Sequence, residues 1–229
     1  MKRGKYNAST YKLFETITLF AIAMAFLESL FVVYLRNIVH PIGSPIFNLE
    51  LARETATIIM LACIGILAGR ERHEKFAFFA YSFAIWDIFY YIFLKIVLNW
   101  PPSLFTWDTL FYIPVKWAGP VIAPVLVSLT LIVFALVIEK AEGTGKKVYL
   151  KLSEESLFIG GILVVLFTFL YDYSKIFING VFSLSGQEIL QLMNAYTPTT
   201  YNWTVFIIGE LLMILGIWMI CRRYAKHPK

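Results

Sequence analysis

Asp87 lies in the middle of an almost continuous apolar run that extends from Lys75 to Trp100. The run is long enough to cross a bilayer, and an ionised side chain at that depth costs about 3 kcal/mol or more unless it faces protein, water or a partner. An aspartate side chain is too short to reach the bilayer surface from there. Asp87 is therefore predicted to belong to a functional site.

Other ionisable residues lie in or beside apolar runs. Glu28 and Glu54 are expected to face Asp87, because acid-bearing stripes on neighbouring helices are satisfied by turning toward each other. The candidate binding set also includes basic residues expected at the mouth of the pocket that these acids form, aromatic residues close to Asp87, and one acid in a loop. Its members are Arg36, Arg53, Lys95, Trp86, Tyr90, Tyr91 and Asp108. The alternative for the basic residues is that their long side chains only extend to the membrane–water interface and have no function.

These residue types support two kinds of chemistry. Three carboxyl groups suit the binding of a small solute, a cation or a lipid headgroup. Alternatively, Asp87 acts as a general acid, with Glu54 and Glu28 as further catalytic groups and aromatic ring faces that stabilise a cationic intermediate. The five residues Trp86-Asp87-Ile88-Phe89-Tyr90 resemble the acid-bearing helix of fungal integral-membrane terpene cyclases. This resemblance implies an acid that acts on an isoprenoid, and it is too short to assign a family.

Several catalytic centres are excluded by residue type. The chain has three histidines, and none falls in an apolar run. This excludes haem held by paired intramembrane histidines, a ferritin-like di-iron site and a Ser-His-Asp triad within the membrane. No resident metal or cofactor is predicted, although the carboxyl groups leave a hard cation open as a ligand.

Composition determines the class of protein. Hydrophobic residues make up 59% of the 229 residues and charged residues only 15%, against roughly a quarter charged in soluble domains. The expected fold is all-α, a polytopic integral membrane protein that forms a single domain over residues 1–229. The net charge of +5 comes from the loops, so it does not indicate nucleic acid as a partner.

Six apolar segments are expected to span the membrane, over residues 12–35, 51–68, 76–98, 115–138, 156–173 and 201–221. With both termini in the cytoplasm, this division puts 15 of the 20 lysine and arginine residues inside, as the positive-inside rule requires. The expected location is a plasma or inner cell membrane. Short interfacial helices are expected in the outer loops, over residues 104–112 and 187–197.

Two local features concern the helices themselves. Pro120 and Pro124 are expected to kink a fourth helix that starts at Pro114, and the alternative is a broken helix that lines the pocket. Glycine pairs such as Gly65 and Gly69 predict close helix contacts.

Three functions stay open on the sequence. The first is an outward-facing pocket that binds a small solute, cation or lipid headgroup, with transport as one use of it. The second is an enzyme acting on a lipid or isoprenoid, and the third is a structural subunit of a membrane complex. The bilayer and a small solute or lipid are the expected partners, and assembly into a homo-oligomer is left open.

Overall fold

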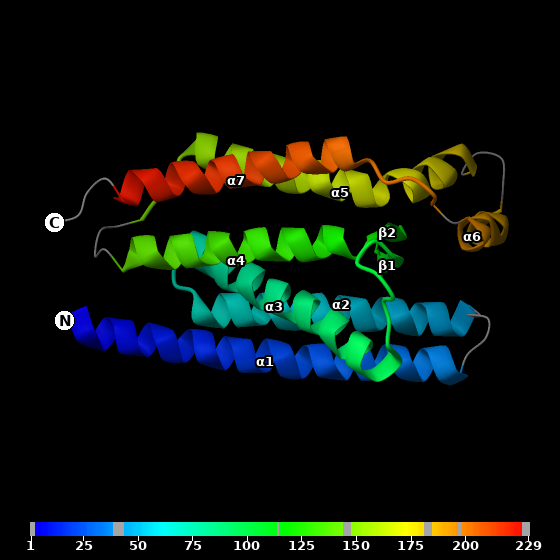
Figure 1. The fold of residues 1–229 in the computed structure, drawn as a ribbon, viewed down its shortest axis with the longest axis horizontal. Helices are drawn as coiled ribbons and strands as arrows, with labels where there is room; N and C mark the ends of the chain where they lie inside the picture. Colours follow the sequence, from blue (N-terminus) through cyan, green and yellow to red (C-terminus); the bar gives the residue numbers. More distant parts are fainter. Residues whose placement is uncertain are drawn as a thin grey trace.

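The computed structural model describes residues 3–38, 44–113, 115–143, 148–180, 185–196 and 198–225. Six long helices form a bundle along the longest axis of the molecule, and the one over residues 72–98 is inclined to the others (Figure 1). They are α1 (Arg3–Ile38), α2 (Ser44–Ala68), α3 (Arg72–Leu98), α4 (Ile122–Glu142), α5 (Leu152–Gly180) and α7 (Trp203–Ala225). A short helix, α6 (Gly186–Ala195), precedes α7, and a hairpin of β1 (Trp107–Phe111) and β2 (Trp117–Pro120) precedes α4.

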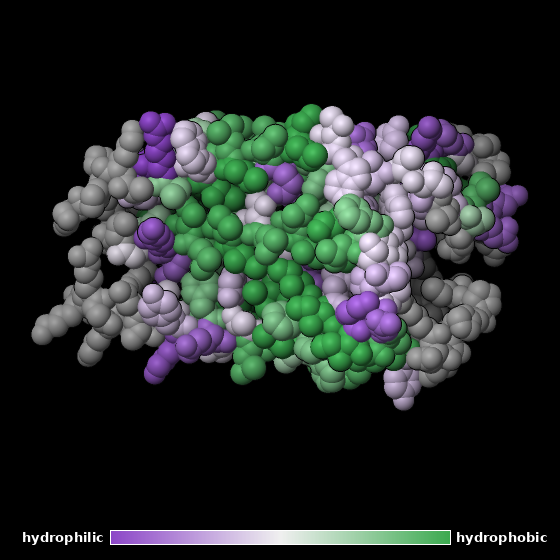
Figure 2. Space-filling view, viewed as in Figure 1, coloured by the Kyte–Doolittle hydropathy of each residue, from purple (hydrophilic) through white to green (hydrophobic). Residues whose placement is uncertain are grey.

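All six long helices are long and apolar enough to cross a membrane. Their outward surfaces carry large exposed apolar side chains such as Leu67 and Leu163. On the face in Figure 2, hydrophobic residues form a band across the middle and hydrophilic residues gather toward both ends. The predicted number of spans and their order are therefore confirmed, and the chain is a multi-pass membrane protein. The helices α1 and α5 extend beyond the predicted spans, because a helix can continue into polar surroundings where the apolar run stops.

The bundle has two groups of helices joined through α4. The helices α1, α2 and α4 pack on α3, whereas α5 and α4 pack on α7. Glycine allows the closest approaches. A Cβ atom at Gly161 of α5 would lie 2.5 Å from the carbonyl oxygen of Gly209 in α7. A Cβ atom at Gly65 or Gly69 would similarly meet the backbone of Lys75 at 2.5 Å or less, which confirms the predicted close contact there.

The expectation of a helix over residues 104–112 is wrong. This segment contributes β1, which pairs antiparallel with β2 so that Asp108 lies opposite Gly119. Segments rich in tryptophan, phenylalanine and threonine fit a strand as readily as an interfacial helix, and here pairing with β2 satisfies the backbone. The chain is mostly helical rather than strictly all-α.

The start of the fourth span and its proline kink are also predicted wrongly. Residues 117–120 are a strand, and α4 begins at Ile122. Pro120 therefore precedes the helix, while Pro124 lies in its first turn, where the missing N–H would have no intrahelical partner. Pro114 lies outside the described residues.

The predicted helix near residue 190 is confirmed as α6. Ser185 caps it and forms a reciprocal capping box with Glu188. Ile189 and Met193 are buried in a cluster with Tyr173 of α5 and Ala118 of β2. The helix thus packs over the hairpin end of the bundle (Figure 1).

Candidate functional site

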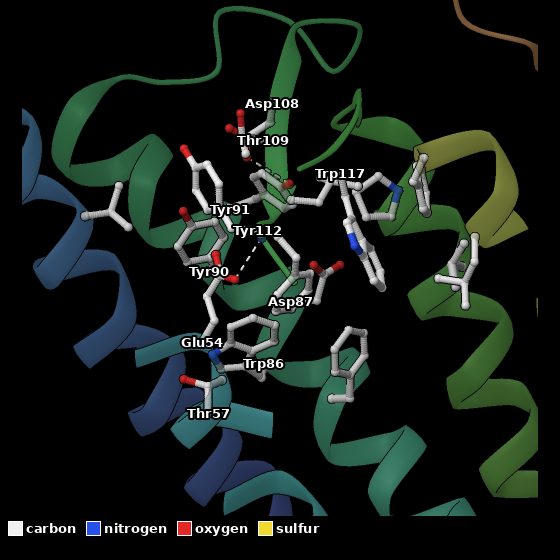
Figure 3. A pocket seen from close by; sticks show the side chains of 18 of the residues that line it. Glu54, Thr57, Trp86, Asp87, Tyr90, Tyr91, Asp108, Thr109, Tyr112 and Trp117 are labelled. Carbon is white, nitrogen blue, oxygen red and sulfur yellow. Dashed lines mark hydrogen bonds between the residues drawn. The ribbon is translucent and has the colours of Figure 1, made fainter. Parts of the chain in front are cut away.

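A cavity of about 280 Å³ lies beneath the hairpin, among α2, α3, α4 and α5. Its charged lining residues are Glu50, Arg53, Glu54, Asp87 and Asp108. Its walls are largely aromatic, formed by Phe83, Trp86, Tyr90, Tyr91, Phe111, Tyr112, Trp117 and Phe169. Figure 3 shows many of these side chains turned toward one common space below the hairpin.

Asp87 is 7% exposed and lies on the wall formed by α3. One of its carboxyl oxygens, Oδ2, accepts a hydrogen bond of 2.8 Å from the hydroxyl of Ser128 in α4. This contact orients the carboxyl group at the interface of the two helices. Ser128 has no distinctive signal in the sequence, because its role depends on how α4 is rotated against α3.

Glu54 joins α2 to the hairpin. Its Oε2 accepts a hydrogen bond of 2.8 Å from the backbone N–H of Tyr112, just after β1 (Figure 3). The hairpin is also tied to α3, since the hydroxyl of Tyr91 donates to Asp108 at 3.1 Å. Glu54 and Asp108, both predicted from the sequence to bind a ligand, therefore also hold the hairpin in position above the cavity.

Burial and nearby charges shift the pKa values of two residues beside the hairpin, Tyr112 and Lys116. Burial raises the pKa of Tyr112 to about 12, and the carboxyl groups of Glu50, Glu54 and Asp108 contribute to the same rise. Burial also lowers the pKa of Lys116, with Asp108 opposing it. The nearby carboxyl groups therefore oppose ionisation of Tyr112, and the carboxyl group of Asp108 only partly offsets the effect of burial on Lys116.

Arg53 and Glu28 lie at the edge of this site. The guanidinium group of Arg53 is paired with Glu28 of α1 and with Glu50 of its own helix. Glu28 also accepts a hydrogen bond from Thr57. Glu28 does not line the cavity and instead lines a second hollow together with Arg53.

Of two further candidates, Lys95 does not line the cavity, and the side chain of Arg36 is not placed. The Lys95 amine donates to the carbonyl oxygen of Pro101 at 3.1 Å, so it binds the chain that follows α3. The side chain of Arg36 lies outside the described residues. The remaining candidates, Trp86, Tyr90, Tyr91 and Asp108, line the cavity with Asp87 and Glu54.

Two indole groups in the cavity wall have buried N–H donors without a hydrogen-bond partner among the described residues. They belong to Trp86 of α3 and Trp117 of β2. A buried donor left unsatisfied costs about 1–3 kcal/mol, so both are candidates for bonding a bound molecule. Trp117 was missed as a site residue because the sequence pattern assigned it to a helix.

The lining combines carboxyl groups, aromatic ring faces and two indole donors. No group of three or more histidine, cysteine or acidic side chains in the described part of the chain is arranged to hold a metal ion. The lining can offer charge, hydrogen bonds and ring faces to an organic molecule. Comparisons with protein-family models, curated proteins and solved structures found no match, so the proposals that follow depend on this geometry.

Proposed function

We propose that this membrane protein binds a small organic cation in the cavity beneath the hairpin. One observation carries the proposal: the described lining residues include four carboxyl groups but a single guanidinium group, among aromatic walls. That guanidinium, on Arg53, is already paired with Glu28 and Glu50, and it lies 4.0 Å from Glu54. The described lining therefore has more acidic groups than basic ones.

The aromatic walls suit the same ligand. The rings of Trp86 and Tyr90 stack with centroids 6.1 Å apart, and those of Phe111 and Trp117 meet at 5.3 Å. A cation over such ring faces gains about 2 kcal/mol when it is desolvated. A volume of about 280 Å³ is at the lower end for ligand pockets, which favours a compact organic cation.

The charge dependence of binding tests this proposal. We expect tetramethylammonium to bind the protein in nanodiscs and the neutral tert-butanol, of similar size, not to bind, because only the cation meets the carboxyl groups and ring faces. Equilibrium dialysis with radiolabelled compounds measures this, with empty nanodiscs as background. Equal binding of the two compounds, or none of either, would contradict a cation site.

The second candidate function is an enzyme acting on an isoprenoid or another lipid. It is favoured by Asp87, whose carboxyl group is held by Ser128 at the wall of an aromatic cavity. In this role Asp87 donates a proton and the rings stabilise the resulting carbocation. Mass spectrometry of lipids incubated with the purified protein separates the two functions. An isomer or cyclised product formed by the parent protein and not by an Asp87→Asn variant would indicate catalysis.

We also propose that the hairpin end faces away from the cytoplasm of a plasma or inner membrane. Basic residues are concentrated at the opposite end of the bundle, at Arg70, Arg72, Lys151, Arg222 and Arg223. Basic residues favour the cytoplasmic side of a membrane. The cavity would then be reached from outside the cell.

Cysteine labelling tests this orientation in a variant whose two native cysteines are replaced by alanine. A membrane-impermeant maleimide added to intact cells is expected to label Ser103→Cys, beside the hairpin, and not Ser153→Cys at the start of α5. Both serines are exposed in the structure. The reverse pattern would contradict the orientation.

A further inference from the structure

A second hollow, of about 340 Å³, lies on the outer surface between α1 and α2. Its walls are apolar, with Phe20, Ala23, Leu27 and Phe31 on α1 and Met60 on α2. Leu27 and Met60 are 67% and 43% exposed, and both lie within membrane-spanning segments. We call this hollow the α1–α2 groove; in a bilayer it faces the lipid.

Among the described residues, the α1–α2 groove and the cavity share one lining residue, Arg53. The helices α1 and α2 each pack along α3 rather than along each other. At this level they are joined by Glu28 of α1, which is paired with Arg53 and hydrogen-bonded to Thr57 of α2. Both Arg53 and Thr57 also line the cavity. Arg53 is thus the residue that lines both spaces.

We propose that the natural ligand is a cationic amphiphile that comes from the bilayer and passes between α1 and α2. Its headgroup occupies the cavity, and its alkyl chain lies in the α1–α2 groove. The cavity is too small to hold the alkyl chain of the amphiphile as well as its headgroup. The α1–α2 groove beside Arg53 is apolar, so it suits the alkyl chain. Glu28 and Glu50, which pair with Arg53 in this structure, exchange that partner for the headgroup as it passes. This inference rests on the cation site proposed above.

Two probes that share a headgroup test the path of the chain. Tetramethylammonium occupies only the cavity, whereas dodecyltrimethylammonium needs the groove as well. Ala23→Trp fills the groove from a lipid-exposed position, so the variant is expected to fold. Leu211→Trp on α7 is the matched control, because Leu211 is lipid-exposed and lines neither space. Binding is measured in nanodiscs, with empty nanodiscs to correct for partition into lipid.

We expect Ala23→Trp to weaken the binding of dodecyltrimethylammonium about tenfold or more, a difference of at least about 1.4 kcal/mol. The same variant should bind tetramethylammonium as the parent does, and Leu211→Trp should leave both affinities unchanged. If Ala23→Trp binds both probes like the parent, the path through the groove is overturned and the cation site stands. If the parent protein binds neither probe, the cation site fails and this inference fails with it.

Discussion

Asp87→Asn is expected to weaken tetramethylammonium binding on the order of a hundredfold, because loss of the charge on one partner of a buried charge pair costs about 3 kcal/mol. The substitution removes one negative charge and changes the side-chain volume little. An asparagine retains an oxygen that can accept the hydrogen bond from Ser128, so the contact between α3 and α4 persists. Loss of binding would therefore reflect the charge rather than the fold.

Glu210→Gln is the matched control for this variant. Glu210 lies within span α7, is also buried, and accepts a hydrogen bond of 2.7 Å from Thr130 of α4. It does not line the cavity. The control should bind tetramethylammonium like the parent protein. Equal losses in both variants would indicate a general effect of removing intramembrane charge, and unchanged binding in Asp87→Asn would overturn the role of Asp87.

Gly161→Ala is expected to destabilise the protein by about 3 kcal/mol, at the upper end of the usual cost of overpacking. The added Cβ atom would lie 2.5 Å from the Gly209 carbonyl oxygen and 2.8 Å from the backbone nitrogen of Met213. Neither backbone atom can rotate away, so α5 and α7 must separate along their closest contact. Thermal unfolding in detergent, followed by tryptophan fluorescence, measures the loss.

The neighbouring residue provides the control with the opposite expected sign. A Cβ atom at Gly160 has no atom within 4 Å, and alanine in a helix is more favourable than glycine by up to about 1 kcal/mol. Gly160→Ala should therefore be neutral or stabilising. Equal stability of the two variants would contradict the close packing of α5 against α7.

The sequence alone determined the six spans and the small helix α6. Apolar runs of this length can satisfy their backbone groups in a bilayer only as helices, so the length of each run predicts its structure without knowledge of its neighbours. The α6 helix was also a local prediction, since its apolar residues have helical spacing. The segment around the hairpin could not be assigned in the same way, because β1 forms only by pairing with β2, several residues further along the chain.

The tertiary structure decided which polar residues meet. The sequence nominated Asp87, Glu54 and Glu28 as one group, but the rotation of each helix determines which side chains face the same space. The structure turns Asp87 and Glu54 into the cavity, whereas Glu28 lies in the α1–α2 groove beside Arg53. It also brings Ser128 into contact with Asp87 and places Trp117 in the same cavity, from segments about 40 and 30 residues away along the chain. Such partners depend on the packing of whole helices, and no local spacing in the chain encodes them.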